Sequence, residues 1–220
     1  MNLKKSTILA IIGISYTFVQ RIIGTFLPGL FKTPIVGQTT TLLSLLSTLT
    51  IVLFVIYFYK EYVQRDQQKL RNAALLAIVG PSAILLLQVR GLFHVFDKLS
   101  ISLYNISQSL FRLVISRSIE NYQPFIIWVS SIFILYFFIV FYREMLHTNQ
   151  ANLKNATLFA ALGSALGAMI RTLSLLIYLF FREVGRFHEA SGMLAIILFP
   201  LFAFTFITVL YFFWTFYKTQ

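Results

Sequence analysis

The chain has 220 residues, of which 58% are hydrophobic and 11% charged, and its formal net charge is +11. So few charged side chains cannot coat a soluble domain of this size, and the composition therefore indicates a protein whose solvent is the lipid bilayer. The absence of cysteine excludes disulfides, thiolate catalysis and metal sites built on cysteine. Because the basic residues are spread over loops and ends, we expect anionic lipid as their partner and no nucleic acid.

Six apolar runs are long enough to cross a bilayer, for which about 18 consecutive apolar residues are typical. Continuous runs predict helices rather than the alternating strands of a barrel, because backbone groups in lipid must be satisfied internally. We therefore predict an all-α, polytopic integral membrane protein with a single transmembrane domain over residues 1–220. The predicted spans lie near 7–28, 41–59, 73–90, 124–142, 156–181 and 193–217.

The first run follows Lys4 and Lys5 and contains no small-residue cleavage site, so we expect a retained span rather than a signal peptide. Basic residues are more frequent at the two ends and in segments 60–72 and 143–155 than in the alternate loops. By the positive-inside rule both termini are expected in the cytoplasm. The lack of cysteine fits a prokaryotic cell membrane.

A short aromatic-basic motif closes three of the runs. It reads Phe58-Tyr59-Lys60-Glu61, then Phe141-Tyr142-Arg143-Glu144, and finally Phe216-Tyr217-Lys218. The tyrosines and their basic neighbours Lys60, Arg143 and Lys218 are typical of anchors at the lipid headgroup level.

The similarity between copies continues beyond the motif. Ala77 and Gly80 recur at the same offset as Ala160 and Gly163, and Ala10 and Gly13 supply a third version of this half. Such a register predicts three degenerate copies of a two-helix unit, because units that cannot bury their apolar faces alone must pack together.

Between the third and fourth spans, apolar residues gather on one face of a predicted amphipathic helix near 99–117. This helix is expected to lie on the outer membrane surface, or alternatively to cover the bundle as a lid. In the fifth span, Gly163 and Gly167 form a small-residue pattern that allows another helix to approach closely or a second copy to bind. In the last span, Pro200 predicts a kink.

Three arginines are the leading candidates for a binding site. Arg21, Arg90 and Arg171 each lie far into a predicted span that contains no acidic residue. Cations at membrane depth usually face an interior, a cavity or a partner, and clustered guanidinium groups bind carboxylate or phosphate. The alternative is that all three mark the outer boundary of the bilayer and reach out to lipid phosphate.

Two histidines are weak candidates for a metal or haem. His94 and His188 are both expected on the outer side, but neither has a second histidine at helical spacing. No motif of an enzyme stands out, so we expect no catalytic residue, no cofactor and no enzymatic activity.

Two functions remain open on these grounds. The first is a channel or transporter that recognises an anionic solute through the three arginines. The second is a non-catalytic accessory or sensory subunit of a larger membrane complex. The two-helix units, each with an aromatic-basic end and a polar turn, resemble those of prokaryotic membrane sensor modules, which implies signalling through a separate partner.

Overall fold

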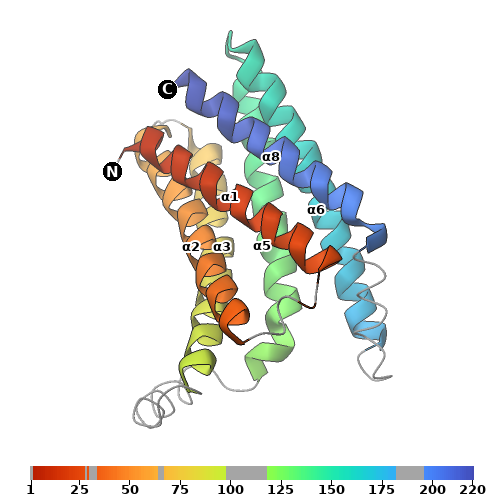
Figure 1. The fold of residues 1–220 in the computed structure, drawn as a ribbon. Coiled ribbons are helices and arrows are strands. Elements are labelled where there is room, and N and C mark those ends of the chain that lie inside the picture. The colour runs from red at the N-terminus through yellow and green to blue at the C-terminus, as the bar shows by residue number, and fades with distance from the viewer. Residues whose placement is uncertain (1, 28, 30–33, 64–66, 98–117, 182–195) are drawn as a thin grey trace.

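A computed structural model describes residues 2–27, 29, 34–63, 67–97, 118–181 and 196–220 (Figure 1). For residues 34, 35, 38, 90–97, 118–121 and 181 it describes the backbone alone. The described part is all-helical, and each of its six long helices is long and apolar enough to span a membrane, which confirms that prediction. The helices are α1 (Leu3–Phe26), α2 (Pro34–Glu61), α3 (Gln68–Asp97), α5 (Ser118–Met145), α6 (Ala151–Phe181) and α8 (Phe199–Thr219).

The helices begin at different points from the predicted spans because polar and proline residues set their first turns. Asn2 caps α1, since its Oδ1 accepts a hydrogen bond from the Lys5 amide at 3.0 Å, and the helix therefore starts before the apolar run. Pro200 lies in the first turn of α8, where it interrupts no helical hydrogen bond, so the predicted kink is wrong. The predicted amphipathic helix near 99–117 falls on a segment outside the described residues.

The six helices form a ring in chain order. Each packs against its neighbour in the sequence, and α1 packs against α8 to close the ring, with the least extensive of these contacts. Figure 1 shows the N- and C-termini at the same end of the bundle, together with the end of α2, the start of α3 and the turn that joins α5 to α6. At that end α8 and α1 are also linked by a hydrogen bond from Gln220 Nε2 to Thr7 Oγ1 at 3.4 Å.

The axis of the ring is filled near the termini by an aromatic cluster of six phenylalanines, each at most 3% exposed. The three motif phenylalanines form a triangle, with ring centroids 5.2 Å apart for Phe58–Phe141, 5.8 Å for Phe58–Phe216 and 6.2 Å for Phe141–Phe216. Such aromatic pairs contribute about 0.5–1.5 kcal/mol each beyond simple burial. The cluster consists of Phe54 and Phe58 from α2, Phe137 and Phe141 from α5, and Phe212 and Phe216 from α8.

Each motif phenylalanine contacts the other cluster phenylalanine of the next motif-bearing helix around the ring. Phe58 meets Phe137 of the next motif-bearing helix at 5.2 Å, and Phe141 meets Phe212 at 5.8 Å. Phe216 completes the circle by meeting Phe54 at 5.8 Å. Tyr62 covers the end of the cluster by stacking on Phe58 at 4.8 Å, and burial raises the pKa of its phenol.

Three glycines set the distance between neighbouring helices. A Cβ on Gly80 of α3 would lie 2.9 Å from Ser130 Cα of α5, and one on Gly13 of α1 would lie 3.0 Å from the Ser47 carbonyl oxygen of α2. A Cβ on Gly163 of α6 would collide with Thr208 Oγ1 of α8. At Gly80 and Gly13 the opposing backbone leaves no room for a Cβ, and at Gly163 the Thr208 side chain occupies that space.

The aromatic-basic motifs have one pattern of exposure in all three copies: phenylalanine buried, tyrosine half-buried and the basic residue exposed. Two of the tyrosines have a cation of the adjacent helix in the ring lying against them, from α3 in one case and from α1 in the other. Arg71 Nε donates to the Tyr59 hydroxyl at 2.9 Å, and Lys4 Nζ lies 5.1 Å from the centre of the Tyr217 ring. These pairs hold the amphipathic rings at the end of the bundle that carries the termini.

Candidate functional site

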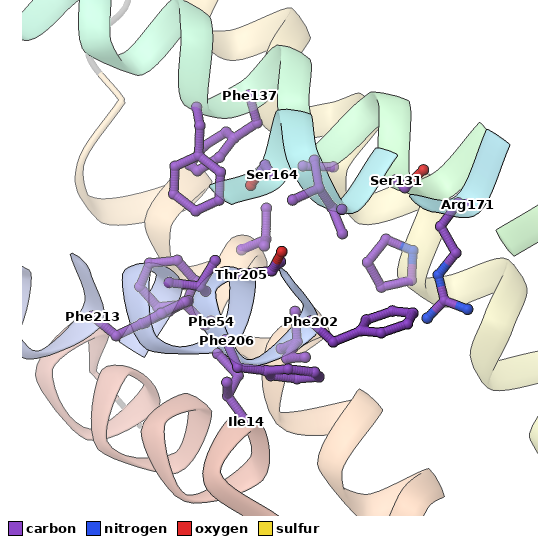
Figure 2. Close-up of a pocket in the computed structure, with 18 residues that line it drawn as sticks. Ile14, Phe54, Ser131, Phe137, Ser164, Arg171, Phe202, Thr205, Phe206 and Phe213 are labelled. Atoms are coloured by element: carbon purple, nitrogen blue, oxygen red, sulfur yellow. The ribbon is translucent and has the colours of Figure 1, made fainter. Parts of the chain in front are cut away.

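A central cavity of about 220 Å³ lies inside the ring and receives side chains from all six helices. Most of its lining is apolar, and Figure 2 shows Phe54, Phe137 and Phe213 at the end opposite Arg171. The aromatic cluster therefore forms the floor of this cavity on the side of the termini. Four polar side chains line it as well: Ser131, Ser164, Arg171 and Thr205.

Two of the three predicted arginines converge on one ring. Arg21 Cζ lies 4.8 Å and Arg171 Cζ 5.8 Å from the centre of the Phe202 ring. Phe202 comes from the first turn of α8 and is only 8% exposed, so the shared ring belongs to the interior of the bundle. The two cations are brought together although 150 positions separate them in the sequence. Figure 2 shows the Arg171 guanidinium beside this ring, at one end of the residues that line the cavity.

The site lies near the end of the bundle that is remote from the termini. At a rise of 1.5 Å per residue, Arg171 is roughly 30 Å from the start of α6 and Arg21 roughly 27 Å from the start of α1. Arg21 is exposed and Arg171 half-buried, which gives the pair an outward-facing and an inward-facing member. No Asp or Glu occurs in α1, α6 or α8, so these helices supply no carboxylate to neutralise the pair.

Arg90 lies on α3, but its side chain is outside the described part of the structure. The alignment of the repeats points to a different residue on this helix. Arg21 and Arg171 each follow their glycines, Gly13 and Gly163, at the same spacing, and that spacing after Gly80 leads to Gln88.

Gln88 was missed by sequence reasoning that searched for a third charge. Its Oε1 is buried and has no hydrogen-bond partner among the described residues. Counting from the repeated glycine, rather than looking for arginine, would have identified the position. Gln88 therefore occupies the register position on α3 that the two arginines occupy on α1 and α6.

The hydroxyl groups of the cavity differ in their hydrogen bonding. Ser131 Oγ donates to the Trp128 carbonyl at 2.6 Å, and Thr205 Oγ1 donates to the Leu201 carbonyl at 3.1 Å. Ser164 Oγ has no partner in the part of the chain that the structure describes, although the residue is only 6% exposed. An unpaired buried hydroxyl costs about 1–3 kcal/mol, which a ligand with a hydrogen-bonding group would relieve.

The structure does not describe the side chains of the two candidate histidines, His94 and His188. His94 falls within α3, which continues beyond the predicted span to Asp97, but its side chain is not described, and His188 lies outside the described residues. Among described side chains, no group of three or more histidine or carboxylate residues could hold a metal ion. The metal prediction for these two histidines therefore stays untested.

Comparisons of the chain with protein-family models, with curated proteins and with solved structures found no match. The function proposed for this protein therefore rests on the geometry of the bundle.

Proposed function

We propose that this protein is an integral membrane carrier for a small anion, bound by Arg21 and Arg171 at the mouth of the central cavity. The observation that supports this proposal is the convergence of both guanidinium groups on the buried Phe202 ring. Two cations of like sign repel each other at short distance, and an anion placed between them removes that repulsion and gains charge-assisted hydrogen bonds. Arg90, or Gln88 in its place, would complete the site from α3.

A triplicated two-helix unit is part of this proposal. The units would be α2 with α3, α5 with α6, and α8 with α1. Support comes from the cyclic contacts of the aromatic cluster and from the three glycines, which all face the first helix of the next unit. We infer a single transmembrane domain, because these contacts link every unit to both others.

The aromatic cluster favours a carrier over an open channel. Its rings are in contact across the axis and almost fully buried, so an ion in the cavity has no wet path toward the termini. Passage would require α2, α5 and α8 to separate at this level, as in alternating access.

Attraction of the arginines to lipid headgroups is the competing explanation. A guanidinium that only reaches out to lipid phosphate gains nothing from sharing a buried ring with a second cation, and Arg171 lines the cavity. Cation–π contacts are worth about 0.5–2 kcal/mol and hold both guanidinium groups close to the Phe202 ring. Exposed Arg21 is left able to meet an anion that arrives from outside.

Uptake into liposomes tests the proposal. Phosphatidylcholine liposomes that contain the protein are expected to take up labelled acetate or phosphate. Arg171→Gln is expected to reduce the initial rate of uptake at least tenfold, since a hydrogen bond to a charged group is worth about 1.5–3 kcal/mol. Arg143→Gln, which removes an exposed cation at the other end, should leave the rate unchanged. Equal rates for Arg171→Gln and the original protein, with unchanged circular dichroism, would exclude the site.

The membrane orientation has its own test, and the natural absence of cysteine makes it simple. We expect a membrane-impermeant maleimide to label Asn149→Cys and Thr219→Cys from the same side, because both positions are exposed at the end with the termini. Gly29→Cys, which follows the far end of α1, is expected to react only from the opposite side. In intact cells, labelling of Gly29→Cys alone would place the termini in the cytoplasm, and labelling of Thr219→Cys alone would reverse that orientation.

The accessory or sensory role is the second candidate. Large apolar side chains are exposed on the bundle, for example Phe180 at 74% and Met169 at 68%, and these surfaces suit lipid and partner helices equally. Gentle extraction that yields a stoichiometric membrane partner, together with no anion uptake, would favour this role over the carrier.

A further inference from the structure

The size and the apolar lining of the central cavity suit a ligand larger than an inorganic anion. Arg171 and Phe202 line its charged end, Arg21 lies against the same Phe202 ring, and most of the rest of the wall is phenylalanine, isoleucine, valine and alanine. Apolar cavities exclude water and bind apolar groups, as shown by a cavity of about 150 Å³ that takes up benzene. At about 220 Å³, this cavity has room for an apolar group larger than a benzene ring.

One face of α6 carries the polar groups of the cavity along a line. Arg171, Gly167 and Ser164 follow each other at helical spacing on the same face, and all three line the cavity. The backbone at Ser164 lies roughly 10 Å deeper than at Arg171, at 1.5 Å per residue. Between them Gly167 has no side chain, and the Thr205 methyl Cγ2 lies close to it, 3.2 Å from where a Cβ would be.

The deep end of this line carries an unused polar group. Ser164 is 6% exposed, its Oγ has no partner in the described structure, and Figure 2 shows it among the side chains that surround the cavity. The neighbouring hydroxyls of Ser131 and Thr205 already donate to carbonyl oxygens of their own helices. Ser164 is therefore the hydroxyl best placed to bond the distal end of a ligand.

We propose that the ligand is an amphiphilic anion with a carboxylate or phosphate head, a short apolar body and a polar group at its far end. The head binds Arg171 and Arg21, the body lies in the cavity between the apolar walls, and the far end bonds the Ser164 hydroxyl. This inference rests on the proposed function, since it specifies the chemistry of the anion at the same site. A soluble hydroxy acid with an apolar chain has all three parts, and a membrane lipid such as phosphatidate shares the anionic head and the apolar body.

Binding to the purified protein in phosphatidylcholine nanodiscs tests the inference, with acetate, octanoate, octanol and 8-hydroxyoctanoate as probes. Octanoate is expected to bind at least tenfold more tightly than acetate, because each buried methylene contributes about 0.8 kcal/mol. Octanol, which lacks the charge, is expected to bind at least tenfold more weakly than octanoate. The terminal hydroxyl of 8-hydroxyoctanoate is expected to add about fivefold, from a hydrogen bond worth about 1 kcal/mol.

Matched variants assign these effects to the cavity. Ser164→Ala should remove the gain from the terminal hydroxyl and keep octanoate binding, whereas Ser174→Ala on the same helix should change neither, because Ser174 bonds the Ile170 carbonyl and does not line the cavity. A photoreactive octanoate should crosslink to cavity residues such as Ile134 or Val209. Crosslinks confined to the lipid-facing residues would overturn the inference.

The outcomes separate this inference from the proposed function. Octanoate that binds no more tightly than acetate, with both dependent on Arg171, would end the amphiphile inference and leave the anion carrier standing. Failure of every anion to bind would end both. Displacement of octanoate by phosphatidate added to the nanodiscs would identify lipid as the source of the ligand, and lack of displacement would identify a soluble acid.

Discussion

Replacing Phe58 by alanine is expected to lower the free energy of unfolding by about 3 kcal/mol, the lower end of the range for buried Phe→Ala changes. Phe58 is fully buried and contacts rings from both other motif-bearing helices, including Phe141 at 5.2 Å and Phe216 at 5.8 Å. In a membrane the loss comes from dispersion contacts and the cavity left behind, because lipid is as apolar as the protein interior. Denaturation with sodium dodecyl sulfate in mixed micelles, followed by circular dichroism, measures the change.

Phe180→Ala is the matched control for this variant. The ring of Phe180 is 74% exposed on α6, so lipid replaces the lost contacts, and the free energy of unfolding should change by less than about 0.5 kcal/mol. In liposomes, Phe58→Ala is also expected to leak anions, because it opens the floor of the cavity toward the termini. Similar stabilities for the two variants would show that the aromatic cluster does not hold the three helices together.

Replacing Gly80 by alanine is expected to destabilise the bundle by about 1–3 kcal/mol, the usual cost of overpacking. The added Cβ would lie 2.9 Å from the Cα of Ser130, so it meets backbone that cannot rotate away, and α3 and α5 must move apart. The same denaturation experiment measures this loss, and circular dichroism should show unchanged helix content in the absence of denaturant.

Gly167→Ala on α6 is the matched control for Gly80→Ala on α3. A Cβ there would meet only the methyl Cγ2 of Thr205, at 3.2 Å, which a small adjustment accommodates. The variant is expected to be neutral or slightly stabilising, because alanine favours helix by about 1 kcal/mol over glycine. Equal destabilisation of both variants would contradict the role assigned to Gly80 as the point of closest approach between α3 and α5.

Much of the fold could be predicted because it depends on local properties of the chain. Length and apolarity decide whether a segment crosses the bilayer as a helix, and all six predicted spans correspond to helices of that kind. The ends were predicted less well, since a cap such as Asn2, or a proline such as Pro200, acts through a few polar contacts that an apolar run does not record.

The candidate site could be predicted only in part. A charge without a partner inside a span is visible in the sequence, and this pointed to Arg21, Arg90 and Arg171 before their surroundings were known. Gln88 was not found, because an uncharged residue in a span carries no such signal, and Ser164 could not be distinguished from other small residues on α6. Their importance comes from burial and a missing hydrogen-bond partner, which depend on the neighbouring helices.

The sequence by itself determined that this protein has apolar helices long enough to cross a membrane, with arginines far into three of the predicted spans, because hydropathy and charge belong to each segment independently of the others. Only the tertiary structure decided that α1 and α8 close a ring, that six phenylalanines fill its axis, and that Arg21 and Arg171 meet at Phe202. Lipid is as apolar as the side chains, so hydropathy does not choose between helix partners. That choice depends on shape, on glycines such as Gly80 that let backbones touch, and on where each ring fits.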